Sequence, residues 1–112
     1  RRSVMAHYLM TGSYTSEAWS AQVQNPQNRL EAVTPVFEAA GGSIESAYMS
    51  FGESDLVLIV QFPDNISAAS LAIALAAGGG VTNWKTTPLI SMDDGVSAIK
   101  QAGTLTYSPP GK

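Results

Sequence analysis

The chain has 112 residues, of which 45% are hydrophobic and 13% charged, and its formal net charge is −3. This length suits one domain, residues 1–112, with one modest hydrophobic core. The acidic balance argues against a nucleic-acid partner, which would require a basic surface. The chain has no cysteine, which excludes disulfides, iron–sulfur clusters and thiolate zinc sites.

The same features bear on where the protein works. The lack of cysteine and of an apolar leader at the N-terminus predicts a cytoplasmic protein. The longest apolar stretch, residues 66–77, is shorter than the roughly 20 residues that span a bilayer, so no membrane partner is expected. Met5 is a candidate natural start, with residues 1–4 an addition to the natural chain.

The first predicted strand covers residues 6–12, and its side chains alternate between two faces. A helix follows, with Thr15 or Ser16 as its cap. Asn25-Pro26 interrupts this helix and is expected to restart it, with Asn25 as the second cap. Gly41-Gly42 is expected to end it, because glycine adopts the left-handed cap conformation without strain.

The next two predicted strands are residues 43–51 and residues 56–62, joined by a turn at residues 52–54. On the first of them, Tyr48 lies on the more polar side. The other strand, LVLIVQF, is apolar on both faces, which indicates burial on both faces.

The remaining elements follow in regular order. Asp64 is expected to cap a helix over residues 66–77, which a run of three glycines ends. Residues 81–90 read as a fourth strand, and Ser91 with Asp94 resembles the capping box of a last, amphipathic helix. Residues 104–112 contain two prolines and a glycine and are predicted to form an extended tail.

This order predicts an α+β fold of the ferredoxin-like type, β-α-β-β-α-β plus a C-terminal helix. Its antiparallel sheet would carry both long helices on one face. The apolar second face of the strand at residues 56–62 then requires a cover that one chain does not supply. We therefore expect the protein to be its own partner, as a sheet-on-sheet homodimer or a higher oligomer.

Residues 41–55 carry the most specific pattern of the chain, G-G-x-x-x-S-x-Y-x-x-F-G-x-x-D, followed by V-L-I-V and P-D-N. Together with N-P-Q-N-R-L-E-A-V at residues 25–33 and T-T-P-L at residues 86–89, it resembles the GYD-domain family. The resemblance implies a small ferredoxin-like domain similar to the dimeric α/β-barrel proteins, and it implies no particular reaction. Ser54 stands where the family has the tyrosine of its name.

Three residues are candidates for catalysis: His7, Tyr48 and Asp55. The single histidine, His7, could act as a general base, although a strand histidine is more often structural. Asp55, with Glu53, could serve acid–base chemistry or hold a hard cation, whereas the alternative is that these carboxylates bind backbone amides of the turn. One histidine without cysteine predicts no metal site, and no cofactor is expected.

The predicted ligand-binding residues are His7, Tyr48 and Trp84, because aromatic side chains with a polar tip suit a small-molecule pocket. The alternative is that they pack a dimer interface. We predict a homo-oligomeric module that binds a small apolar or aromatic molecule. The alternative function is a cofactor-free enzyme of the dimeric α/β-barrel type, a small monooxygenase or isomerase, and whether the protein is an enzyme stays open.

Overall fold

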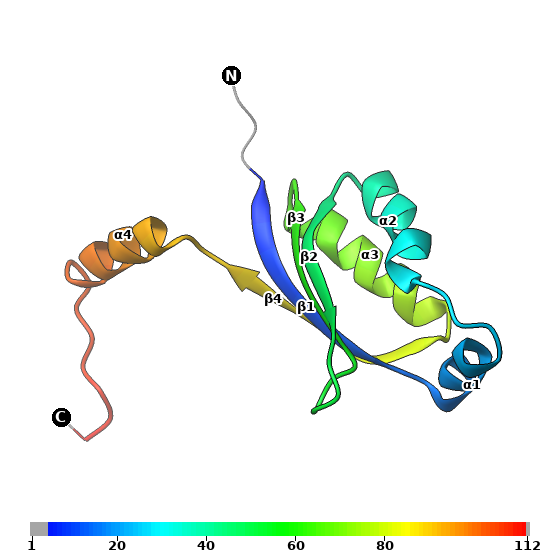
Figure 1. The fold of residues 1–112 in the computed structure, drawn as a ribbon. Helices are drawn as coiled ribbons and strands as arrows, with labels where there is room; N and C mark the ends of the chain where they lie inside the picture. Colours follow the sequence, from blue (N-terminus) through cyan, green and yellow to red (C-terminus); the bar gives the residue numbers. More distant parts are fainter. Residues whose placement is uncertain (1–4, 112) are drawn as a thin grey trace.

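The computed structural model describes residues 5–111, so the expectation for residues 1–4 lies outside the described part of the chain. Four strands and four helices follow one another in this part (Figure 1): β1 (Ala6–Tyr14), α1 (Ser16–Gln24), α2 (Arg29–Ala39), β2 (Ser43–Met49), β3 (Leu56–Phe62), α3 (Asn65–Ala77), β4 (Val81–Leu89) and α4 (Met92–Ala102). Residues 104–111 contain neither helix nor strand. Within residues 5–111, no helix has both the length and the apolar character needed to cross a membrane.

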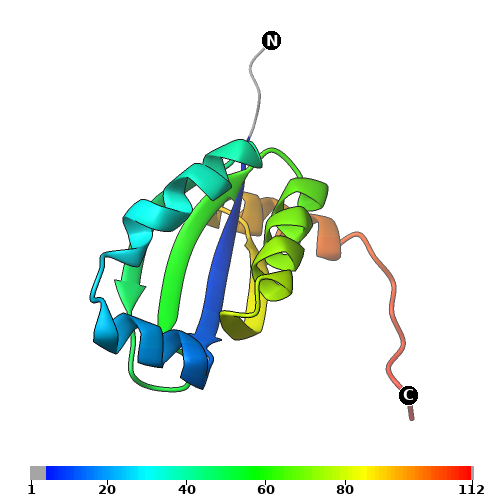
Figure 2. The same cartoon turned by 90° about the vertical axis from the view of Figure 1, so that its right-hand side faces the viewer.

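The four strands form one antiparallel sheet in the order β2-β3-β1-β4. Helices α1, α2 and α3 cover one face of this sheet, whereas α4 lies on the side of the other face (Figures 1 and 2). This arrangement confirms the predicted ferredoxin-like α+β fold with an additional C-terminal helix. We call the sheet face away from α1–α3 the open face.

The helix starts show why the sequence forms these elements. Thr15 caps α1, Asp64 caps α3 and Ser91 caps α4, each through a side-chain oxygen that accepts a backbone N–H of the first turn. At Asp64 this hydrogen bond from Ser67 holds the pKa of the carboxyl below its usual value. Gly41, at φ 87°, ends α2 as predicted.

Two predicted boundaries were wrong. Asn28, not Asn25, caps α2, since its side chain accepts a hydrogen bond from the Leu30 N–H at 3.0 Å. Asn25 instead closes α1, because its own N–H donates to the Ala21 carbonyl. Strand β2 ends at Met49 rather than at residue 51, and the Ser50 N–H donates to the Asp55 carbonyl across the loop to β3.

The hydrophobic core lies between the sheet and its helix layer. It consists of side chains from β1, α2, β3 and α3: Tyr8, Met10, Phe37, Leu58, Val60, Phe62, Ala68 and Leu71. The Tyr8 hydroxyl is satisfied by donating to Asn65 Oδ1 at 2.6 Å. Alternation along β3 turns Val57 and Ile59 to the open face, where both are only half-buried.

Candidate functional site

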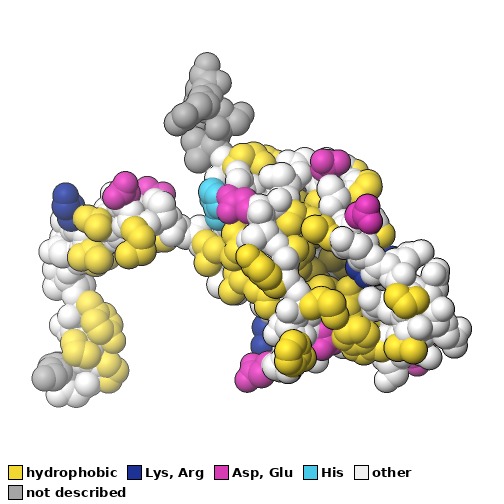
Figure 3. Space-filling view, in the orientation of Figure 1, with side chains coloured by type: hydrophobic (Ala, Val, Ile, Leu, Met, Phe, Trp, Pro, Cys, Tyr) yellow, Lys and Arg dark blue, Asp and Glu magenta, His cyan; other side chains and the backbone are white. Residues whose placement is uncertain are grey.

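A cleft of about 790 Å³ lies between the sheet and helices α1, α2 and α3. We call it the helix–sheet cleft. Its apolar walls come from the helices and the inner face of the sheet: Val33, Phe37, Ala47, Leu56, Leu58, Leu75 and Trp84. Figure 3 shows hydrophobic side chains around a hollow between the sheet and the helices. The cleft therefore offers an apolar interior that the core side chains do not fill.

The rim of the helix–sheet cleft is polar and comes from the end of α1, the start of α2 and the segment between them. Gln22, Asn25 and Asn28 line this rim, and so does Arg29, the first residue of α2. Among the described residues that line the cleft, Arg29 is the only one with a charged side chain. An apolar interior with a single cationic group at its edge is suited to a molecule with an apolar body and one anionic group.

Tyr14 lies at the same rim, at the end of β1. Burial raises the pKa of its hydroxyl above the usual value, and the charge of Asp55 acts in the same direction. The positive charge of Arg29 acts against this rise. Tyr14 is therefore a neutral hydroxyl at physiological pH, and it can both donate and accept a hydrogen bond beside Arg29.

Asp55 fixes this end of the cleft. Its Oδ2 accepts hydrogen bonds from the Tyr14 N–H at 2.9 Å and from the Trp19 indole N–H at 3.3 Å. Its own N–H donates to the Gly12 carbonyl at 2.9 Å. The rings of Tyr14 and Trp19 meet edge to face at 5.0 Å between centroids. These bonds tie α1 and the end of β1 to the loop before β3.

Trp84 lies on the helix side of the sheet, on the same face as Thr86, and β4 carries a bulge directly beside it. Between the pairs Thr11–Lys85 and Ser13–Thr82, two residues of β4, Asn83 and Trp84, lie opposite Gly12. Asn83 takes a positive φ of 52° there, a conformation that asparagine tolerates. The Trp84 ring covers Gly12 so closely that a Cβ at Gly12 would lie 2.3 Å from Trp84 Cε3.

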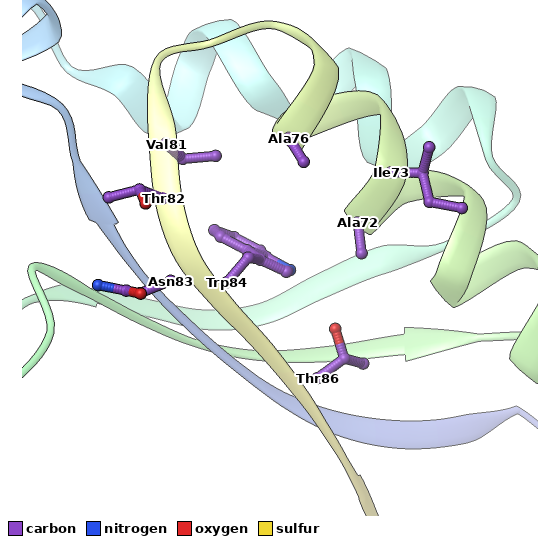
Figure 4. Close-up of a pocket in the computed structure, with 8 residues that line it drawn as sticks. All are labelled: Ala72, Ile73, Ala76, Val81, Thr82, Asn83, Trp84 and Thr86. Carbon is purple, nitrogen blue, oxygen red and sulfur yellow. The ribbon is translucent and has the colours of Figure 1, made fainter.

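A second hollow, of about 460 Å³, lies between α3 and β4 on the other side of Trp84. Figure 4 shows the Trp84 ring between the two elements, with the Thr86 hydroxyl directed toward α3. The Trp84 indole nitrogen and the Thr86 hydroxyl are buried without a hydrogen-bond partner. Leaving a buried donor unpaired costs about 1–3 kcal/mol, so this hollow favours water or a ligand with an acceptor.

His7 lies elsewhere, on the open face. Its Nε2 is 2.8 Å from Glu45 Oε1, which also accepts a hydrogen bond from Gln61 Nε2 at 2.6 Å. A bulge in β2 leaves Glu45 unpaired between Ile44 and Ser46 and directs it to these partners. Figure 3 shows the histidine beside an acidic side chain at the surface. Neither hollow is lined by His7.

The strand pairing divides the three predicted ligand-binding residues between the two faces of the sheet. Trp84 lies on the helix side and borders the helix–sheet cleft. Tyr48, paired with Val57, faces the open side as His7 does, and it touches only the exposed outer edge of the cleft. The catalytic candidates His7 and Asp55 lie at opposite ends of β1, since His7 pairs with Gln61 whereas Asp55 bonds to Gly12 and Tyr14. They do not form an acid–base pair within one chain, and their catalytic roles stay predictions.

The sequence-based interpretation did not name Arg29, Tyr14, Phe37 or Glu45 as site residues. Arg29 carried one usable signal, since it is one of only six cationic residues and lies inside the N-P-Q-N-R-L-E-A-V pattern. No sequence signal indicated the contact between Glu45 and His7, because that contact depends on the bulge in β2 and on the strand order. Within residues 5–111, no three of the His, Asp and Glu side chains gather as metal ligands would.

The fold and the cleft define a class: a small ferredoxin-like α+β protein with an apolar hollow under its helix layer. The family model described as the GYD domain matches residues 8–99. The chain therefore belongs to the GYD domain family, as its sequence pattern indicated. Comparison with curated proteins and with solved structures gave no match.

Proposed function

We propose that this GYD-domain protein is a homo-oligomeric module that binds a small apolar or aromatic molecule with a carboxylate group in its helix–sheet cleft. The observation that supports this proposal is the pairing of an apolar hollow with one cationic side chain, Arg29, at its rim. The volume of about 790 Å³ lies within the range of small-molecule sites.

The interior of the cleft supports an apolar or aromatic body for the ligand. Phe37 and Leu58 are almost fully buried beneath it, and Trp84 presents its ring to it. A flat aromatic ligand would gain both apolar burial and ring stacking against these side chains. No group of opposite charge balances Arg29 among the described residues that line the cleft, so an anionic substituent would supply the missing partner.

The test compares naphthoic acid with naphthamide, two probes of nearly equal shape that differ in charge. Isothermal titration calorimetry should show the acid binding at least about tenfold more tightly than the amide, as expected for a charge-assisted hydrogen bond. Arg29→Gln should remove this preference and leave amide binding unchanged. Lys85→Gln, which removes a cation from the open face, should change neither affinity.

Two outcomes would contradict the proposal. Failure of both probes to bind at millimolar concentration would show that the cleft is not a site for this class of molecule. Equal loss of acid binding in Arg29→Gln and Lys85→Gln would show that the acid responds to net charge and not to the cleft.

The oligomeric part of the proposal rests on the open face. Leu9 of β1 and Val57 and Ile59 of β3 lie side by side on it, and no helix within residues 5–111 covers them. A two-fold stack of two open faces would bury these side chains in both copies. Sedimentation equilibrium at micromolar concentration should give twice the chain mass, and Ile59→Asp should give the chain mass.

A matched variant separates this interface from general surface effects. Ile66 on α3 is 78% exposed and lies on the helix side, so Ile66→Asp should leave the dimer intact. A wild-type protein that sediments at the chain mass would contradict the dimer without affecting the proposal for the cleft.

A further inference from the structure

Helix α4 extends from the end of β4 on the side of the open face and does not pack against the body of the protein (Figures 1 and 2). The two views agree that α1–α3 and α4 lie on opposite sides of the sheet. A helix of eleven residues without packing is marginal in water, because most helix stability in proteins comes from burial of an apolar face. The position of α4 therefore requires a partner surface.

Helix α4 has a pronounced apolar stripe. Met92, Val96 and Ile99 share one side of the helix at spacings of four and three residues, and all three are exposed. Asp94 lies on the opposite side, and Asp93 and Lys100 flank the stripe. Figure 3 shows this separation, with the charged side chains of α4 on its outer surface and hydrophobic ones on the side turned toward the C-terminal tail.

The tail extends the same apolar surface. Leu105 and Tyr107 are 67% and 77% exposed, and Figure 3 shows hydrophobic side chains of the tail facing those of α4. Ile90, between β4 and α4, is 65% exposed as well. We call residues 90–107 the arm. Its apolar residues are exposed, and no other element within residues 5–111 packs against α4.

We infer that the arm of each copy packs against the body of a second copy and clasps the dimer formed through the open faces. This inference rests on the dimer of the proposed function. The arm lies on the side of the sheet where the second copy would stack, and the stripe of α4 would continue the apolar surface of Leu9, Val57 and Ile59. A second copy therefore supplies a partner for both exposed surfaces at once.

The charges of α4 favour a second copy over a membrane surface. Helices that lie on membranes usually carry lysine and arginine on their polar face. The polar face of α4 carries two aspartates and one lysine, which would repel an anionic lipid surface.

The test uses three single variants of the full chain. Ile99→Asp places a charge on the apolar stripe and should raise the dissociation constant of the dimer by at least about tenfold, because an unpaired charge is costly to bury. Ser97→Asp, on the polar side of the same helix, should change it less than about twofold, as expected for an exposed surface position. Ile59→Asp on the open face should abolish the dimer.

A photo-crosslinking amino acid at position 99 identifies what the stripe contacts. Irradiation should give a covalent dimer, with the crosslinked peptide assigned to the second copy by mixing isotopically labelled and unlabelled protein. The same group at position 97 should give little covalent dimer. Circular dichroism of each variant should match the wild type, because both positions lie outside the core.

Three results would overturn the inference. A dimer that Ile59→Asp dissociates but Ile99→Asp does not would leave the sheet interface standing and remove the arm from it. A monomeric wild-type protein would contradict both the sheet interface and the role of the arm. Binding of the protein to phosphatidylserine vesicles that Ile99→Asp abolishes, with the dimer unchanged, would assign the stripe to a membrane.

Discussion

The indole nitrogen of Trp19 donates a hydrogen bond to Asp55 Oδ2 across 3.3 Å and so joins α1 to the loop between β2 and β3. The same oxygen accepts the Tyr14 N–H, and Asp55 therefore connects segments that are about forty residues apart in the chain. Asp55 follows Gly52, Glu53 and Ser54, at the position of the aspartate in the name of the family. On this geometry, the aspartate positions the rim of the cleft.

Replacing Asp55 by alanine should lower the free energy of unfolding by about 2–4 kcal/mol, because two donors lose a charged acceptor. Asp55→Asn keeps one oxygen and should lose less. Urea denaturation measures both, with Glu53→Ala, on an exposed neighbour, as the control. A loss for Asp55→Ala no larger than that of the control would contradict the positioning role.

The contact between Gly12 and Trp84 gives a second prediction. Gly12→Ala should destabilise the fold by about 1–3 kcal/mol, because the new methyl group meets the Trp84 ring. In a Trp84→Leu background the same change should be nearly neutral. The control is Gly95→Ala in α4, where an added Cβ meets no atom within 4 Å and helix propensity favours alanine. A Gly12→Ala cost that persists without Trp84 would place the strain in the backbone.

Leu58 tests whether β3 is central to the core. It is 4% exposed, so Leu58→Ala should cost about 2–5 kcal/mol, which is a large part of a typical domain stability. Ile73→Ala, at a position 68% exposed on α3, should cost less than about 0.5 kcal/mol. Chemical denaturation of the two variants compares them directly. Equal losses would mean that Leu58 of β3 does not contribute to the core.

The raised pKa of Tyr14 predicts how stability changes in alkali. As pH rises through 10.0, the usual value, the unfolded chain loses the Tyr14 proton while the folded chain keeps it. The unfolded state is then favoured, so the free energy of unfolding falls above this pH and is unaffected by Tyr14 below it. Tyr14→Phe should make that fall shallower in denaturation measured across the alkaline range. An unchanged pH profile would show that Tyr14 titrates alike in both states.

Much of the fold could be predicted from the sequence because local signals agree with the tertiary structure. The unbroken apolar run of β3 indicated a buried strand. Thr15, Asp64 and Ser91 could be identified as helix caps from their residue types alone. The break between α1 and α2 was misplaced because Asn25 and Asn28 are equally good caps by type. The hydrogen bonds of the folded chain distinguish them, since the Asn25 N–H donates to the Ala21 carbonyl whereas the Asn28 side chain accepts the Leu30 N–H.

The candidate site was less predictable, for a physical reason. Trp84 was among the predicted ligand-binding residues, and simple alternation places it on the same face as Thr86. The bulge at Asn83, which reverses the facing of Thr82 and Val81, could not be read from the sequence pattern. The grouping of Tyr14, Arg29 and Asp55 depends on contacts between α1, α2 and the loop before β3. Such contacts arise from packing across long separations, which local patterns do not encode.

The two tryptophans allow the central claim to be tested in one measurement. A proton–nitrogen correlation spectrum of the full chain should show two indole signals, one from Trp84 at the cleft and one from Trp19 bonded to Asp55. On titration with naphthoic acid, the Trp84 indole signal and the backbone amides of Val33 and Arg29 should shift together and saturate. Ala47→Trp, which fills the cleft, should suppress these shifts. Shifts confined to the open face, around Leu9 and Ile59, or no saturable shift at all, would contradict a ligand site in the helix–sheet cleft.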